Sequence, residues 1–517
     1  VNFVMKISLS KIIKFALIII VTLCLLALVS KSFIISKIEA TLSEKLPQQI
    51  HLTYKDINLN TFARSLTINE PNLQLTDTTG SIIAGTITLK EIAIKNFGLI
   101  DYIFNKNISF NTILLNTPKG FIHNNFNLKD DQNKTISNDD RTIEAITLNH
   151  FIVENANLKL IDDTKDSLKL SATNFNLKVD DITISDINTN PGLVYKSYTI
   201  DSDSILMKLG PFENLKIKQI EGTHLKTILS EVELKTKYKP QELHLHISTE
   251  RDHYDLGIDT ISLANIALDL NLDQPTINLL VLDLINPNLK IYRDKLVADD
   301  LTKKPMISEM IRNIPLRFKI DSFNIKNAAV RYKERVHSYN SGGELIFTNS
   351  NINIQNLTNI DSISPIKINI HSNFYGKSPV TAEWNFDLYN QNDNFTFKAE
   401  IDALDLNEIN TFCTPNLNTA MSGEFKKLYY TISGNKNNST IDLKVDYTDI
   451  KISILNKTHK QRNKFYSTLA NLVVSHSSET KKSQYKEARA EVKRDKSKSN
   501  INFIVLNIKN GLAKILI

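Results

Sequence analysis

The chain has 517 residues, of which 41% are hydrophobic and 23% are charged, so apolar residues suffice for several cores or for one long repetitive element. Only 14 glycines and 13 prolines occur, which excludes a collagen-like chain and argues against low-complexity disorder. Two cysteines, Cys24 and Cys413, argue against a disulfide framework, and a net charge of +6 is too small at this length to indicate a partner.

The N-terminal region contains an uncharged apolar run from Phe15 to Val29, preceded by lysines. Together with Ile12, Ile13 and the residues up to Ile35, the run reaches the roughly 17–25 residues that a membrane span needs. A cleaved signal peptide is the alternative, but no clear small-x-small cleavage site comes after the run. The sequence therefore predicts a short cytoplasmic tail over residues 1–11 and a membrane anchor over residues 12–35, with the bulk of the chain beyond the membrane.

After Pro47 the chain alternates apolar and polar residues, which predicts short strands that have one apolar and one polar face. One eight-residue unit recurs: an apolar residue, two mostly polar residues, Pro or Ala, and an alternating ending. Its copies are INEPNLQL (Ile68–Leu75), LNTPKGFI (Leu115–Ile122), VENANLKL (Val153–Leu160), LINPNLKI (Leu284–Ile291) and IKNAAVRY (Ile325–Tyr332). The Pro suits a break or bulge between two strands, or a sheet edge, and a loose repeat of this kind is typical of an elongated array.

Helical signals are few. Leu99–Phe104 is expected to form a turn or two of helix, and apolar spacing over Asp300–Ile314 predicts a helix that Asp300 caps. The last seventeen residues, from Ile501, are read as a strand followed by a short apolar helix. Residues 124–142 are expected to form a surface loop.

The chemistry-bearing motifs of common enzymes are absent, and no catalytic residue, metal site or cofactor is predicted. The only close set of histidines is His244, His246 and His253, of which the first two would share one strand face. A metal site would need further ligands, so surface histidines are the simpler interpretation. Residues 457–498 contain 12 Lys/Arg against 4 Asp/Glu. This basic segment is read as a solvated face, with anionic lipid headgroups or an acidic partner as the alternative and no nucleic acid expected.

The apolar strand faces must be covered by a second sheet, by helices, or by something that is not protein. Two arrangements stay open: a closed two-sheet sandwich, or a curled sheet whose apolar trough is lined for lipid acyl chains. The residues that would line such a trough are Leu66, Ile68, Leu73, Leu75, Ile87, Leu89, Leu158, Leu160, Leu289 and Ile291. In a sandwich the same residues would be ordinary core.

The order of these features resembles the AsmA-like family of Gram-negative bacteria, in the forms found in Bacteroidetes. The resemblance combines the tail, the anchor and the repeated unit with matching segments at both ends of the chain. Those segments are Tyr54–Leu75, Ile94–Pro118, Phe397–Asn410, Met421–Phe425, Ile441–Leu455 and Phe503–Ile517. Between about residues 185 and 280 the match is looser.

The resemblance implies a mainly β protein in which a transmembrane helix precedes an elongated, curled antiparallel sheet that forms a repeating β-groove with a few short helices. The modules implied are an N-terminal one over residues 36–185, middle groove repeats over 186–395 and a C-terminal one over 396–517. It further implies a single-pass inner-membrane protein, similar to TamB and YhdP-like proteins, whose periplasmic part conducts phospholipids to the outer membrane and so supports outer-membrane biogenesis.

What the resemblance implies about partners is limited to phospholipids, the inner membrane, and the outer membrane or a partner there at the C-terminus; it brings no catalytic residues. Two other functions stay open. The protein could be a periplasmic scaffold that assists outer-membrane protein assembly or secretion by binding polypeptide at a sheet edge. It could also be a hydrolase whose site includes His244, His246 or His253.

Overall fold

A computed structural model describes most of the chain beyond its N-terminus. The residues described are 35, 36, 38–40, 42, 46–77, 82–98, 107–124, 126, 145–162, 167–185, 192–270, 275–360, 364–455, 477–479 and 483–516. Within these ranges no helix has the length and apolar character that crossing a membrane requires. The predicted anchor over residues 12–35 lies almost entirely outside the described residues, as do the expected helix at 99–104 and nearly all of the loop at 124–142.

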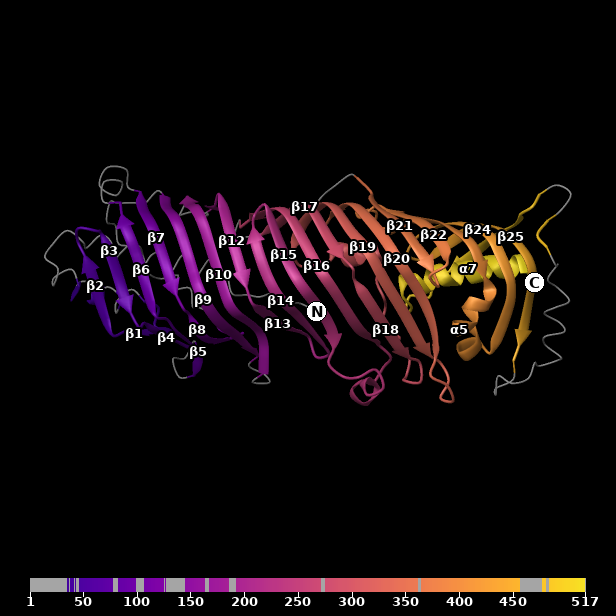
Figure 1. Cartoon of the computed structure of the whole chain (residues 1–517), viewed down its shortest axis with the longest axis horizontal. Coiled ribbons are helices and arrows are strands. Elements are labelled where there is room, and N and C mark those ends of the chain that lie inside the picture. Colours follow the sequence, from indigo (N-terminus) through magenta and orange to yellow (C-terminus); the bar gives the residue numbers. More distant parts are fainter. Residues whose placement is uncertain are drawn as a thin grey trace. The chain divides into compact units, whose positions relative to one another are not determined.

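The protein is mainly β, as predicted, and its residue contacts divide it into two compact units. Unit 1 comprises Val1–Glu231 and Ala264–Asn278, and unit 2 comprises Val232–Leu263 and Leu279–Ile517. Figure 1 shows the strands of each unit lying side by side. Three strands have residues in both units: β15 (Lys226–Thr236), β16 (Asp252–Asp269) and β17 (Thr276–Ile285).

The remaining described strands of unit 1 are β1 (Ile50–Thr53), β2 (Asp56–Asn60), β3 (Ser65–Asn69), β4 (Asn72–Thr76), β5 (Ile83–Thr88), β6 (Glu91–Phe97), β7 (Ile108–Asn116), β8 (Lys119–His123), β9 (Ala145–Asp162), β10 (Ser167–Ser185), β11 (Gly192–Val194), β12 (Ser197–Ser202), β13 (Ser204–Leu209) and β14 (Glu213–Thr223). Unit 2 adds η1 (Leu243–His246), β18 (Asn288–Asp294), α4 (Ile307–Arg312), β19 (Arg317–Arg335), β20 (Gly343–Thr358), β21 (Ile366–Phe374), β22 (Ser378–Phe386), β23 (Phe395–Asp405), α5 (Leu406–Leu417), β24 (Thr419–Gly434), β25 (Asn438–Ile454), β26 (Lys486–Lys493) and α7 (Asn500–Leu516).

The sheets are mixed, which corrects the expectation of a purely antiparallel sheet. Most neighbours pair antiparallel, but β9 runs parallel to β7 and β8 in unit 1, and β19 runs parallel to β18 in unit 2. Parallel neighbours need a long connection that returns the chain to the same end. Residues 124–144 and 295–316 supply these two connections.

The five copies of the repeated unit are points at which the backbone turns left-handed, as a bulge within β9 and β19 and as a break between two strands in the other three copies; we call all five bulges. The third residue of every copy has a positive φ: Glu70 (50°), Thr117 (52°), Asn155 (54°), Asn286 (52°) and Asn327 (56°). The fourth residue, Pro or Ala, is buried in every copy. One extra residue at the bulge shifts the alternation by one position, so apolar residues before and after it face the same side of the sheet.

Neighbouring copies are joined by the same hydrogen bonds in both units. In unit 1, Thr117 N donates to Glu154 O at 2.8 Å, and Asn157 N donates to Pro118 O at 2.7 Å. The corresponding bonds of unit 2 run from Asn286 N to Lys326 O at 2.9 Å and from Ala329 N to Pro287 O at 2.8 Å. We call each such junction between two parallel copies a seam.

Two helix predictions were wrong in extent. The helix expected over Asp300–Ile314 is only the six residues of α4, and it begins after Met306 rather than at Asp300. Asp300 instead accepts a hydrogen bond from Thr302 N at 3.0 Å, as turn residues do. Pro305 excludes helix before it, because a residue that precedes proline is pushed out of the helical region.

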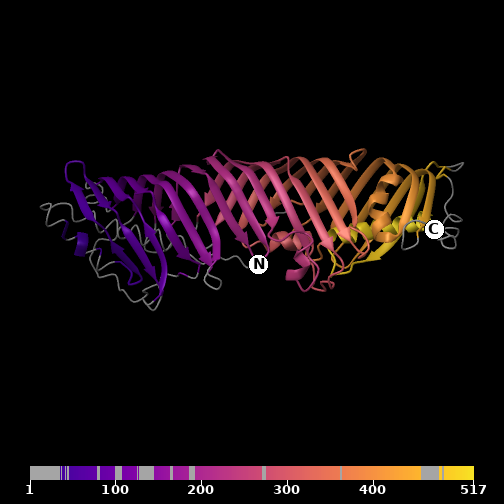
Figure 2. The ribbon, with the colours of Figure 1, turned by 60° about the horizontal axis from the view of Figure 1, so that its bottom comes forward.

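The last segment is one continuous helix, α7, and not a strand followed by a helix. Figures 1 and 2 show α7, in yellow, running across β24, β25 and β26. Phe503 and Ile504 of this helix are 3% and 7% exposed. They belong to the large hydrophobic core of unit 2, so tertiary packing outweighs the β-branched composition of the segment.

Candidate functional site: the apolar sheet faces

In unit 1, apolar side chains on successive strands line up directly opposite one another in continuous rows. The first row is Leu52, Leu73, Ile87, Gly120, Leu158, Ala172, Ile205 and Ile217, across β1, β4, β5, β8, β9, β10, β13 and β14. The second is Ile50, Leu75, Gly85, Ile122, Leu160, Leu170, Met207 and Leu215, across the same strands. We call these two rows the unit 1 rows. Directly opposed residues share one face of a sheet, so the rows form a continuous apolar band.

The length of this band is set by the spacing of the strands. Eight strands about 4.8 Å apart span about 34 Å before twist is considered. One leaflet of a bilayer contributes about half of its roughly 30 Å hydrocarbon core. The band is therefore longer than the depth that an acyl chain occupies in a leaflet.

Two glycines in the rows are positions of close backbone approach between β5 and β8. A Cβ at Gly120 would lie 1.9 Å from Thr86 O, and one at Gly85 would lie 2.7 Å from Phe121 O. Any larger residue would force these two strands apart. The packing of the two strands therefore requires glycine at both positions. Because glycine has no side chain, the surface of the apolar band is recessed at this point.

A second set of rows on β2, β3, β6, β7, β9, β10 and β12 is covered at its beginning. Here Ile57, Ile68, Ile92, Leu115, Val153, Leu177 and Ile200 are opposed in order, as are Leu59, Leu66, Ile94, Ile113, Phe151, Val179 and Tyr198. Ile38 and Leu42, from the segment before β1, pack on the first strands and are 1% and 4% exposed. Burial is therefore nearly complete at β2 and β3 and becomes partial toward β10 and β12.

Unit 2 contains a comparable row that a helix covers. Ile368, Trp384, Phe397, Ile432, Ile441 and Ala490 are opposed across β21 to β26. All six are at most 9% exposed. Over this stretch α7 supplies the cover: the rings of Phe395 and Phe503 are 6.1 Å apart, and Ser439 Oγ donates to the buried Asn507 Oδ1 at 2.9 Å.

The ten residues predicted to line a trough fall into two classes of burial. Leu66, Ile68, Leu75 and Leu89 are 4% to 7% exposed and belong to packed core, and of these Leu75 also lies in the unit 1 rows, where Phe126 packs with it. Leu73, Ile87, Leu158 and Leu160 are only partly buried and lie in the unit 1 rows. Leu289 and Ile291 are also partly buried, and both lie in unit 2. On the neighbouring strands, Leu289 lies between Leu256 and Val330, and Ile291 lies between Tyr254 and Tyr332.

Sequence reasoning missed more than half of each unit 1 row. The residues it missed include Leu170, Ala172, Ile205, Met207, Leu215 and Ile217 on β10, β13 and β14. These strands alternate in sequence as the others do, which is the signal that could have found them. They lack the repeated unit, which is a stronger local signal than alternation alone. The repeated unit marks β4, β8 and β9 in the same rows.

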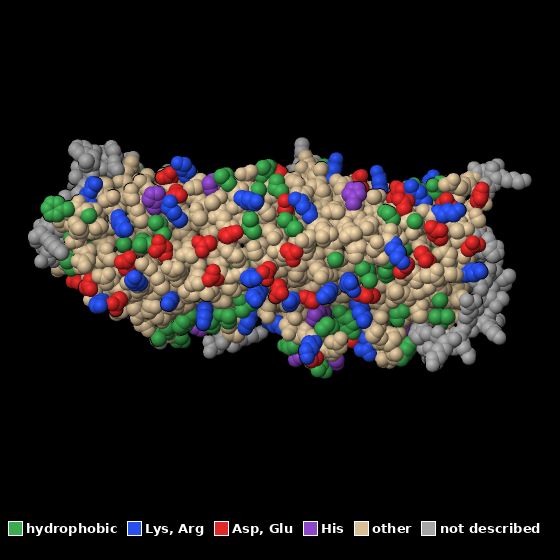
Figure 3. Space-filling view, in the orientation of Figure 1, with side chains coloured by type: hydrophobic (Ala, Val, Ile, Leu, Met, Phe, Trp, Pro, Cys, Tyr) green, Lys and Arg blue, Asp and Glu red, His purple; other side chains and the backbone are tan. Residues whose placement is uncertain are grey.

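The opposite faces of the strands are polar. Figure 3 shows a face on which charged side chains of both signs are spread over the strands of each unit and hydrophobic ones are scattered. Several of these charges pair across strands, as Lys218 and Glu231 do in unit 1 and Lys444 and Glu487 do in unit 2, the latter at 2.7 Å. This polarity leaves the apolar rows as the faces that require cover.

The three histidines do not form a site. His244 and His246 lie in the short helix η1 and not on a strand face, and both are exposed. His253 is buried on β16, where its Nε2 lies 2.8 Å from Tyr238 O. Among the described residues, no group of three or more His, Cys, Asp or Glu is placed to hold a metal ion.

No model of a known protein family matches the chain, and no curated protein matches it. The geometry of the described residues is therefore what carries a functional inference.

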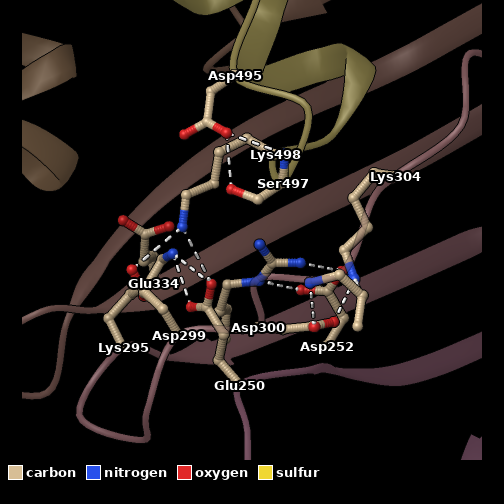
Figure 4. Close-up of polar contacts among 12 residues, drawn as sticks. Glu250, Asp252, Lys295, Asp299, Asp300, Lys304, Glu334, Asp495, Ser497 and Lys498 are labelled. Atoms are coloured by element: carbon tan, nitrogen blue, oxygen red, sulfur yellow. Dashed lines mark hydrogen bonds and ion pairs between the residues drawn. The ribbon is translucent and has the colours of Figure 1, made fainter.

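An ionic cluster in unit 2 fixes the segment that leads into α7 (Figure 4). Glu250 is 6% exposed, and its carboxylate lies 2.6 Å from Lys295 Nζ and 3.5 Å from Lys498 Nζ. Lys498 also lies 3.4 Å from Asp299. Burial alone would lower the pKa of Lys498, but the charges of Glu250 and Asp299 outweigh it, so the pKa is raised.

The cluster extends along β16, β18 and β19. Arg293 binds both carboxylate oxygens of Asp252 at 2.7 Å, and Tyr332 donates to Glu334 at 2.6 Å. Burial, and next the charge of Glu334, raise the pKa of Tyr332 far above its usual value. The carboxylates of Glu250, Asp252 and Asp299 are paired with lysine or arginine within unit 2, so we interpret the cluster as structural: it holds α7 over the covered row.

Proposed function

We propose that the protein binds the acyl chains of phospholipids along the unit 1 rows, and that it supports phospholipid passage between the inner and outer membranes. The observation that supports this most is the partial burial of the rows. Leu158, Leu160, Leu170, Ile205 and Met207 are aligned in register but none of them is fully buried. The two described helices with extensive strand contacts, α5 and α7, pack on β19, β20 and β24 to β26 and not on β8 to β14.

The energetics of this proposal are near balance. Each CH₂ group that an acyl chain buries against the rows contributes about 0.8 kcal/mol, which is comparable to what the chain loses when it leaves a bilayer. Transfer is then close to neutral, and direction has to come from another source. Acyl chains would lie along the apolar band while headgroups stay in water.

The location of the protein is part of the same proposal. The resemblance to the AsmA-like family, together with the apolar run over residues 12–35, supports an inner-membrane anchor with the bulk of the chain in the periplasm. A β-groove protein of this kind would take part in outer-membrane biogenesis without being an enzyme.

The test is a photo-crosslinker placed at single positions of the full chain in cells of a Gram-negative host. Leu158 and Leu160 lie in the unit 1 rows, whereas Lys159 lies between them on the opposite, exposed face. We expect phospholipid to crosslink at Leu158 and Leu160 at least several-fold more than at Lys159. Mass spectrometry of the crosslinked species identifies the ligand.

Two outcomes would overturn the proposal. Silent crosslinkers at Leu158 and Leu160 would mean that protein covers the rows, as in a sandwich. Crosslinks to polypeptide without lipid would favour the scaffold that assists outer-membrane protein assembly.

A further inference from the structure

A charged pocket in unit 2 lies at the junction of four segments. The segments are α4 with the residues on either side of it, the turn between β22 and β23, the turn between β24 and β25, and the linker between β26 and α7. The pocket has a volume of about 360 Å³ and is lined by Lys303, Glu309, Arg312, Asn313, Gln391, Asp393, Lys436, Arg494 and Lys496. Five cationic side chains thus face two carboxylates, which leaves a net charge of +3.

Both carboxylates of the pocket already form ion pairs with cations that line it. Arg312 lies 2.7 Å from Asp393, which is 2% exposed and also accepts from Ser308 Oγ at 2.7 Å. Lys303 lies 3.1 Å from Glu309. The remaining three cations, Lys436, Arg494 and Lys496, have no ion pair with any described residue.

Arg494 is the decisive member of the set. It is 4% exposed, and the only hydrogen bond of its side chain to a described residue runs from Nη2 to Lys304 O at 2.7 Å, while Nε has no hydrogen-bond partner there. Burial lowers its pKa, and the charges of Glu309, Asp393 and Asp495 only partly oppose this. A buried cation without a paired anion is costly and uncommon in proteins.

The pocket is held in place independently of any ligand. Lys436 Nζ donates to Gln391 O at 2.6 Å, which joins the two turns. Lys304 N donates to Lys496 O at 2.7 Å, and Asn500 Nδ2 donates to Pro305 O at 3.0 Å, which joins the linker to the segment before α4. The segments that carry the cations are therefore fixed relative to one another, and the cations line a preformed cavity.

We propose that this pocket binds a phosphate group. Guanidinium matches phosphate oxygens with two parallel donors, and flanking ammonium groups add point charge. The volume lies at the lower end of the range of small-molecule sites, so the pocket would accept a phosphate together with a small attached group. Phospholipid headgroups and soluble phosphate compounds share this chemistry. The site stands on its own geometry and does not depend on lipid binding in unit 1.

The experiment is isothermal titration calorimetry, which measures the binding affinity of each probe for the full chain in mild detergent. The three probes are inorganic phosphate, dihexanoyl phosphatidic acid, whose phosphate is a monoester, and dihexanoyl phosphatidylcholine, whose phosphate charge is balanced by choline. Phosphatidic acid binding at least tenfold more tightly than inorganic phosphate would identify a lipid headgroup as the source. Equal binding of these two would identify a soluble phosphate compound. Either result supports the phosphate site.

Variants separate the site from general charge effects. Arg494→Gln and Lys496→Gln are each expected to weaken binding about tenfold, the loss of one charge-assisted interaction. Lys493→Gln removes the same charge from an exposed position on β26 outside the pocket and is expected to have no effect. Lys496 is exposed, so its variant remains informative if Arg494→Gln fails to fold. Absence of binding to all three probes, or equal binding by the variants and the unaltered chain, would overturn the proposal.

Discussion

The row under α7 in unit 2 and the unit 1 rows are built from the same alternating strands but are buried to different degrees. Ile441 and Leu443, on β25, are 0% and 1% exposed. Leu158 and Leu160, on β9, alternate in the same way but are only partly buried. The difference lies in the cover: unit 2 ends in a helix that packs on the apolar face. Strand alternation therefore specifies an apolar face and does not specify its cover.

The largest expected effect compares one substitution at Leu443, which lies beneath α7 beside the row of unit 2, and at Leu158 in the unit 1 rows. Leu443→Ala should cost about 3 kcal/mol of local opening free energy, because it leaves a cavity beneath α7. Leu158→Ala should cost about 1 kcal/mol, because a partly exposed side chain loses less burial and leaves no closed cavity. Hydrogen–deuterium exchange of β25 and β9 peptides measures both in one full-chain protein. Equal costs would show that the unit 1 rows are as well covered as the row under α7.

A second substitution should uncover the row in unit 2. A Cβ at Gly511 of α7 would lie 3.1 Å from Leu443 Cδ1 and 3.5 Å from two atoms of Ile441. Gly511→Leu should therefore push the helix off the sheet and destabilise β25 by about 2 kcal/mol. Hydrogen–deuterium exchange of the β25 peptide reports the change.

Gly511→Ala is the matched control for this substitution. The single methyl group makes a tight contact, while alanine stabilises the helix by about 1 kcal/mol relative to glycine, so the net effect should be small. Fast exchange in both variants would mean that the helix is poorly packed to begin with.

The smallest expected effect concerns the bulge that both units share. Thr117 has a φ of 52°, a conformation that costs a β-branched residue about 1–2 kcal/mol, whereas asparagine tolerates it. Thr117→Asn should stabilise the β7 to β9 region by about 1 kcal/mol in hydrogen exchange. Asn155→Thr, at a φ of 54° in the neighbouring copy, should destabilise it by a similar amount. If the two variants show the same hydrogen-exchange rates in this region, backbone strain at the bulge does not determine its stability.

The repeated unit can be recognised in the sequence because its chemistry is local. A proline or alanine between two alternating stretches predicts a break or bulge, and the structure has a strand break or a register shift at every copy. The left-handed third residue also has a local signal, since Asn155, Asn286 and Asn327 are of the residue type that adopts positive φ most readily. The seams are not predictable, because hydrogen bonds such as that from Thr117 to Glu154 depend on which strands meet in space.

The last seventeen residues show the opposite case. Ile501, Ile504, Val505 and Ile508 favour a strand locally, so the sequence predicts that the segment begins as one. In α7 the side facing the sheet carries Phe503, Asn507 and Gly511, spaced four residues apart. That spacing is a helical signal, but it includes a polar residue and a glycine, which scales of hydrophobicity count against burial.

The two candidate sites, the unit 1 rows and the phosphate pocket, also differ in how far the sequence predicts them. Alternation locates Leu158 and Leu160, but whether such residues meet protein or remain partly open depends on distant segments. The phosphate pocket has no sequence signature, because its cations come from segments spread between Lys303 and Lys496. The basic composition of residues 457–498 points only to the last of them.

The seams also bear on how the chain tolerates change at these positions. Each seam joins one copy to the next through backbone groups, so it makes no demand on side-chain identity beyond the repeated unit itself. The seams of unit 1 and unit 2 accordingly have the same hydrogen bonds, although the side chains of their copies differ. Loss of one residue within a copy would have a larger effect, because it would turn the apolar side chains of the rest of the strand to the other face of the sheet.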